Sequence, residues 1–299
     1  MKSHSMVKQL HFAKTPFFLT LFIGLLCASF AKAENDLISP QVDLSYLEEE
    51  VPADDYAKAQ CTFDLYLPQD TEKPFPLLVW FHGGALKGGS KSSGLTTKLA
   101  QSFASQGVGV MVADYRLNPK VTFPTYLEDA ANAVRWAVNH TEELNAHKKV
   151  FVGGHSAGGY ITSMLAMDRR YLKQAGVNIE NIGGYLPMSG QTMTHFTVAE
   201  ERGLSSKMIT ADDAAPIHYL KKDMPPIFII IGGDDWPARV EENLYFVAAM
   251  EKVAENENIS MLIVPDRDHS DILRQASVKG DPAGQAMLKF MSDGILPRP

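Results

Sequence analysis

The chain has 299 residues, of which 45% are hydrophobic and 21% are charged. This composition is typical of a globular protein and excludes a disordered or fibrous chain. The formal net charge of −7 gives no electrostatic support for nucleic-acid binding, so we expect no nucleic-acid partner.

The first 33 residues are typical of a secretory signal peptide. A segment with three lysines precedes the apolar run FFLTLFIGLLCASF, and the small-x-small sequence Ala31-Lys32-Ala33 follows it. The apolar run is short for a membrane span. We therefore expect cleavage and an exported protein, periplasmic or secreted, without stable membrane insertion. An uncleaved N-terminal anchor is the alternative.

Apolar patterning predicts that strands alternate with helices along residues 34–299. In chain order we expect strands at 60–68 and 74–84, a helix at 93–107, a strand at 108–117, a helix at 126–140, a strand at 148–154, a helix at 156–167, strands at 183–190 and 225–233, a helix at 240–255, a strand at 260–265 and a helix at 282–293. This order favours a single α/β domain in which helices cover both faces of a mostly parallel sheet. Ligands of such sheets bind beyond the carboxyl ends of the strands.

One connection stands out by its length. Residues 191–224, between two predicted strands, are polar and irregular. Long connections of this kind are often functional, so we expect this segment to form a small lid over the site.

The sequence Gly154-His155-Ser156-Ala157-Gly158 lies between a predicted strand and a predicted helix. A sharp turn there would project the serine hydroxyl, and small neighbours would let the chain fold tightly around it. The helix would direct its N-terminal amides at a developing anion. We therefore predict that Ser156 is a nucleophile. The alternative is a serine that only caps the helix.

A second motif, His82-Gly83-Gly84-Ala85, ends the predicted strand 74–84. Backbone amides aimed at a tetrahedral intermediate stabilise its oxyanion. Gly83 and Gly84 let the backbone approach closely, so we predict that their amides form an oxyanion hole together with the amide of Ala157. The alternative is a simple turn after a buried strand.

A base and a carboxylate would complete such a site. His269 follows the last predicted strand, at the same sheet edge as Ser156, and we predict that it takes the serine proton. Asp234 and Asp235 follow the predicted strand 225–233. We favour Asp235 as the carboxylate that orients the imidazole, because it must reach around the loop toward His269; Asp234 is the alternative.

These motifs together resemble a known family. HGGA, VADYRL, FPTYLEDAANAVRW, GGHSAGG and the pair GGDDW and DRDH are similar to the α/β-hydrolase superfamily. More narrowly, they resemble the esterases related to hormone-sensitive lipase and the bacterial carboxylesterases close to them. The resemblance runs from about residue 60 to 295 and includes the chain order serine, aspartate, histidine. The sequence departs from the family pattern in having HGGA in place of HGGG, and its cap looks reduced to 191–224 and a short N-terminal part.

The resemblance implies hydrolysis of small-molecule carboxylic esters with short or medium acyl groups through an acyl-enzyme. Such chemistry needs no cofactor and no metal, and the one cysteine left after cleavage, Cys61, excludes a cysteine-based metal site. Two alternatives stay open. One is a formamidase-like amide hydrolase, although the aromatic residue after HGG is absent here; the other is a non-catalytic binding module on the same fold.

Overall fold

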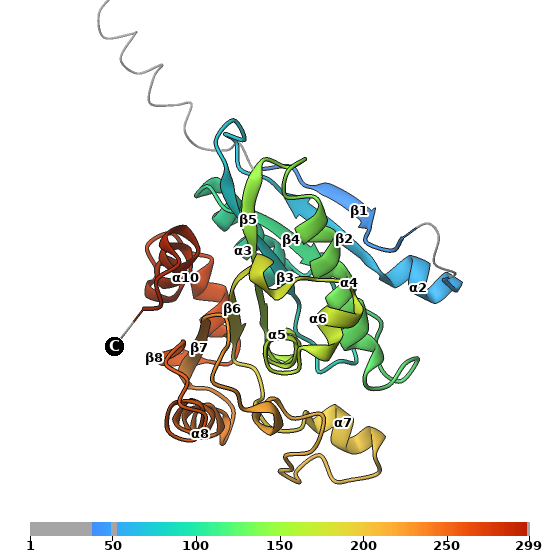
Figure 1. Cartoon of the computed structure of the whole chain (residues 1–299), viewed down its shortest axis with the longest axis vertical. Coiled ribbons are helices and arrows are strands. Elements are labelled where there is room, and N and C mark those ends of the chain that lie inside the picture. Colours follow the sequence, from blue (N-terminus) through green and yellow to red (C-terminus); the bar gives the residue numbers. More distant parts are fainter. Residues whose placement is uncertain (1–37, 49–52, 298–299) are drawn as a thin grey trace, which may run out of the picture. The chain divides into compact units, whose positions relative to one another are not determined.

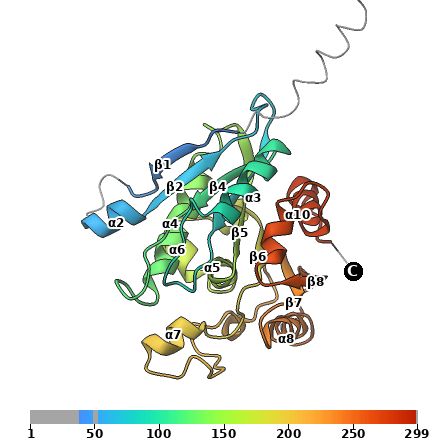
Figure 2. The same cartoon turned by 180° about the vertical axis from the view of Figure 1, so that it is seen from behind.

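The structure of the protein is a computed structural model, which describes residues 38–48 and 53–297. The expected signal peptide lies outside these residues. Residues 38–299 form one compact unit, shown from two sides in Figures 1 and 2. Among the helices that are described, none is long and apolar enough to cross a membrane.

Eight strands form one sheet in the order β1-β2-β4-β3-β5-β6-β7-β8. Pairing is antiparallel between β1 and β2 and between β2 and β4, and parallel from β4 through β8. The strands are β1 Gln41–Ser45, β2 Thr62–Tyr66, β3 Phe75–Phe81, β4 Gly109–Ala113, β5 Ala146–His155, β6 Ile182–Met188, β7 Ile227–Asp234 and β8 Ile259–Asp268.

Helices alternate with the strands along most of the chain, and two helices follow the last strand. The helices are α2 Asp55–Gln60, α3 Gly94–Ser105, α4 Thr125–Asn139, α5 Ala157–Met167, α6 Arg170–Gln174, α7 Phe196–Glu201, α8 Arg239–Lys252, α9 Asp271–Ala276 and α10 Pro282–Asp293, with 3-10 turns at Ile179–Asn181 and Pro216–Tyr219. The sequence predicted the longer of these helices to within a few residues. It missed β1, α2, α6, α7 and α9, each of which has five or six residues.

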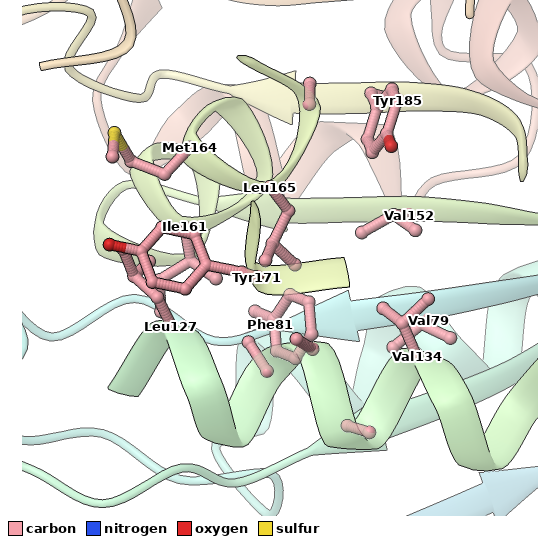
Figure 3. Packing of buried hydrophobic residues seen from close by; sticks show 14 of the residues in the cluster. Val79, Phe81, Leu127, Val134, Val152, Ile161, Met164, Leu165, Tyr171 and Tyr185 are labelled. Carbon is pink, nitrogen blue, oxygen red and sulfur yellow. The ribbon is translucent and has the colours of Figure 1, made fainter. Parts of the chain in front are cut away.

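The two faces of the sheet bury separate hydrophobic clusters. All seven residues of β3 are buried, and because side chains alternate along a strand, Val79 and Phe81 pack on one face while Leu78 and Trp80 pack on the other. Helices α4 and α5 cover the Val79 face, as Figure 3 shows for Leu127 and other residues. Helices α3 and α10 cover the opposite face. As predicted, helices cover both faces of a mostly parallel sheet.

Candidate active site

The chain turns sharply at Ser156, between β5 and α5. Ser156 has φ 58° and ψ −114°, a strained combination that concentrates at functional sites. A Cβ on Gly158 would lie 2.0 Å from the carbonyl oxygen of Phe81, and a Cβ on Gly154 would lie 2.5 Å from the Gly158 carbonyl carbon. Only glycine fits at these two positions, so the sequence pattern follows from the tightness of the turn.

The Ser156 hydroxyl lies beside an imidazole and does not cap the helix. Ser156 makes no side-chain hydrogen bond to the amides of α5. Its Oγ lies 2.8 Å from Nε2 of His269, which follows β8 directly. The structure therefore brings together the two residues that the sequence predicted as nucleophile and base.

The same imidazole contacts a carboxylate on its other side. His269 Nδ1 lies 2.7 Å from Asp235 Oδ1, and the Asp235 side chain is fully buried. Burial alone would raise the pKa of Asp235, but hydrogen bonds, led by the one from His269, outweigh it and hold the pKa below its ordinary value. An ionised Asp235 accepts a hydrogen bond from Nδ1–H, which leaves Nε2 as the acceptor for the Ser156 hydroxyl. Asp234, the alternative, is exposed at the end of β7.

The glycine motif after β3 lies against the serine. A Cβ on Gly83 would lie 3.2 Å from Cβ of Ser156, so the backbone of Gly83 borders Ser156. Gly84 has φ 126°, and a Cβ there would lie 2.0 Å from the carbonyl oxygen of Gly88. Ala157 is the first residue of α5, where amides have no partner within the helix. The three predicted oxyanion donors thus come from the two backbone segments that surround Ser156.

Comparisons with known proteins agree with this fold and arrangement. A family model described as BD-FAE matches residues 63–249, more than half of the chain. The chain belongs to the BD-FAE family. Esterase LipC of Mycobacterium tuberculosis is 25% identical over 239 residues, covering 74% of this chain and 59% of LipC. The isoprenylcysteine alpha-carbonyl methylesterase ICME of Arabidopsis thaliana is 23% identical, covering 88% of this chain and 64% of ICME.

The solved structure of a truncated carbohydrate esterase from gut microbiota superposes with a TM-score of 0.68 at 15% identity, covering 88% of this chain and 98% of that one. These matches confirm the predicted α/β-hydrolase fold and the resemblance to esterases. The chain spans about three fifths of the length of the first curated relatives that it matches.

In this BD-FAE family member, a buried histidine joins the serine turn to the histidine loop. His155, just before the nucleophile, has its Nε2 2.6 Å from the backbone oxygen of His269; because a carbonyl only accepts, Nε2 donates. Burial, and next the nearby His269, lower the pKa of His155 to about 4, so it is neutral at pH 7. The sequence motif indicates no contact between His155 and His269, because this pairing depends on where two separate loops lie.

A polar network fixes the loop that carries Gly83. The His82 ring stacks on Tyr115 at 4.5 Å, and the Tyr115 hydroxyl donates to the His82 carbonyl at 2.9 Å. His82 Nε2 lies 3.2 Å from Asp114, which also accepts from the backbone amide of Lys91. Asp114 and Tyr115 therefore hold this loop, the predicted oxyanion loop, in place.

The segment 191–224 also contacts this loop. Thr197 of α7 donates its hydroxyl to the Ala85 carbonyl at 2.6 Å, and Glu200 pairs with Lys87. Glu201 accepts from the Asn118 side chain at 2.9 Å. Helix α7 thus contacts the predicted oxyanion loop, and the sequence did not predict this contact. Whether the segment acts as a lid stays a prediction.

A second group of polar residues surrounds Asp235. Arg239, almost fully buried, donates from Nη1 to the Ser189 carbonyl at 2.6 Å and pairs through Nε with Glu242 at 3.2 Å. The Ser189 side chain contributes to the lowered pKa of Asp235. Ser189 Oγ and Asp235 Oδ2 are both buried, and neither makes a hydrogen bond within the described residues. No cluster of three or more potential metal ligands occurs in the described part of the chain.

Proposed function

We propose that the protein is a serine carboxylesterase that hydrolyses small-molecule esters with short to medium acyl groups through an acyl-enzyme. The observation that carries this proposal is the unbroken contact from Ser156 Oγ to His269 and on to Asp235. Membership of the BD-FAE family and the esterase names of relatives such as LipC support it. The range of acyl groups rests on the family resemblance alone.

In the first half-reaction, the ester carbon is attacked by Ser156 Oγ while His269 Nε2 takes the hydroxyl proton. The amides of Gly83, Gly84 and Ala157 stabilise the negative charge on the former carbonyl oxygen. Asp235 stabilises the imidazolium and keeps its tautomer. His269 then donates the proton to the alkoxy oxygen, the carbon–oxygen bond breaks, and the alcohol leaves an acyl-Ser156.

In the second half-reaction, a water molecule takes the place of the alcohol. His269 removes a proton from this water, which attacks the acyl carbon, and the same amides hold the second oxyanion. His269 returns the proton to Ser156 Oγ, the bond between Oγ and the acyl carbon breaks, and the carboxylic acid is released. His155 and the Asp114 network act through the groups that they hold in place.

We also propose that the protein is exported, because residues 1–33 have the basic, apolar and small-residue order of a secretory signal. Mass determination of the N-terminus of the protein recovered from cells tests this proposal. We expect the mature chain to begin at Glu34. A protein that keeps its first 33 residues would contradict cleavage.

Substitution of the nucleophile tests the activity. We expect Ser156→Ala to abolish hydrolysis of p-nitrophenyl acetate while circular dichroism and the melting temperature stay near those of the parent protein. Ser163→Ala, at a buried serine seven residues further along the same helix α5, is the matched control and should keep its activity. Undiminished turnover by the Ser156 variant would refute the assignment.

A further inference from the structure

An exposed tryptophan lies on the face of the imidazole. The indole of Trp236 stacks on the His269 ring at a centroid distance of 3.9 Å and an interplanar angle of 19°. Trp236 is 47% exposed, whereas the His269 side chain is only 7% exposed. A large apolar ring is thus exposed to solvent directly beside the imidazole that transfers the proton.

The backbone fixes Trp236 relative to the site. Its amide donates to Asp235 Oδ1 at 2.6 Å, and its carbonyl accepts from the amide of Arg239 at 2.9 Å. The Arg239 guanidinium lies 5.7 Å from the indole centroid, a distance at which a cation attracts an aromatic ring. The stacking on His269 and the nearby guanidinium therefore favour this position of the indole over the imidazole.

The reaction itself places one part of the substrate next to this ring. The alkoxy oxygen of the ester must receive its proton from His269 Nε2, so the alcohol half leaves along the imidazole. The acyl half, bonded to Ser156, has no such requirement. A group on the alcohol carbon therefore comes closest to Trp236.

We propose that Trp236 forms one wall of an alcohol-side subsite that selects esters of aromatic alcohols. This inference rests on the proposed esterase activity and names the class of its leaving group. Aromatic rings attract one another in edge-to-face and offset arrangements beyond what area burial alone supplies. An aromatic ring on the alcohol carbon meets the exposed part of the indole, whereas a saturated chain gains only contact area.

Three acetates with the same acyl group and alcohols of similar acidity test the proposal: benzyl acetate, cyclohexylmethyl acetate and butyl acetate. We expect the parent enzyme to have its highest kcat/KM on benzyl acetate. In Trp236→Ala, the ratio of kcat/KM for benzyl acetate to that for cyclohexylmethyl acetate should fall about two- to tenfold, the size of one aromatic pair. Trp236→Phe should retain most of the ratio.

The ratio of kcat/KM for benzyl acetate to that for cyclohexylmethyl acetate distinguishes recognition of the alcohol by Trp236 from positioning of His269 by Trp236. If Trp236 only holds His269 in place, the alanine variant loses the same factor on all three acetates and the ratio stays constant, which overturns the proposal. Tyr245→Ala, which removes another exposed aromatic ring, on α8, should leave the ratio unchanged. A parent enzyme that hydrolyses none of the esters would instead refute the esterase activity itself.

Discussion

At the scale of single residues, the Asp235 carboxylate combines full burial with a lowered pKa. An isolated buried carboxylate would take up a proton, because burial disfavours the charged form. Here His269 and the Trp236 amide donate to one oxygen of the carboxylate, and the Ser189 side chain lies beside it. The site therefore depends on neighbours of Asp235 that no sequence motif identifies.

We predict that Ser189→Ala lowers kcat up to about tenfold, because Asp235 loses a polar group that lies beside it and stabilises its charge. Ser189 has φ 53°, and alanine carries a similar strain there, so the substitution removes the hydroxyl alone. We expect kcat on p-nitrophenyl acetate to fall while KM and the melting temperature change little. An unchanged kcat would contradict a positioning role for Ser189.

At the scale of elements, α7 is a short helix whose place follows from its contacts with the oxyanion loop. Helices of this length have little stability of their own. The Thr197 hydroxyl reaches the carbonyl of Ala85 from a fully buried position, while Glu200 and Lys87 form a half-exposed ion pair. The buried hydrogen bond should therefore matter more than the ion pair.

We predict that Thr197→Val, which keeps the shape and removes the donor, lowers kcat about three- to tenfold with little change in KM, because the oxyanion loop loses one of its supports. Steady-state kinetics on p-nitrophenyl acetate measure both constants. Glu200→Gln is the matched control in the same helix and should change kcat less than about twofold. Equal losses in both variants would argue against a specific role for the Thr197 contact.

Sequence patterns predicted the long elements and missed the short ones for a physical reason. The strand β3 is buried throughout and reads as a continuous apolar run. By contrast, β1 is an edge strand of mainly exposed residues, and its pairing with β2 decides its conformation. The predicted strand 108–117 ends at Ala113, because Asp114 and the residues after it turn toward the oxyanion loop.

The candidate site could be predicted in part on the same grounds. Ser156 and the glycines around it stand in one short stretch whose residue types are dictated by a tight turn. His269 and Asp235 could be located because parallel strands end at one edge of the sheet. The contacts of His155, Ser189 and Trp236 depend on how separate loops fold over that edge, and their residue types alone do not encode this.

At the scale of the whole molecule, two buried histidines couple stability to pH. Burial lowers the pKa of His155 to about 4 and that of His195 to about 3, against 6.5 for a free side chain. At pH values below 6.5 and above these lowered pKa values, both histidines are protonated in the unfolded chain and neutral in the native protein. The free energy of unfolding should therefore fall as the pH decreases from about 6.5 toward 4.

We predict that His155 alone accounts for about 2 kcal/mol of this loss between pH 7 and pH 5. Urea denaturation at both pH values measures it. His155→Gln lacks the titrating group and should lose correspondingly less stability over the same interval. An equal loss in the parent protein and in the variant would mean that His155 is not neutral in the native state.

The proposed activity depends on Ser156 being a nucleophile activated by His269. Reaction with diisopropyl fluorophosphate, followed by peptide mass spectrometry and an activity assay on the same sample, tests this directly. We predict one phosphoryl adduct, on the peptide that contains Ser156, formed in parallel with the loss of esterase activity, and much slower labelling of His269→Ala. An adduct on another residue, or full activity after complete labelling of Ser156, would contradict the role of Ser156 as the nucleophile.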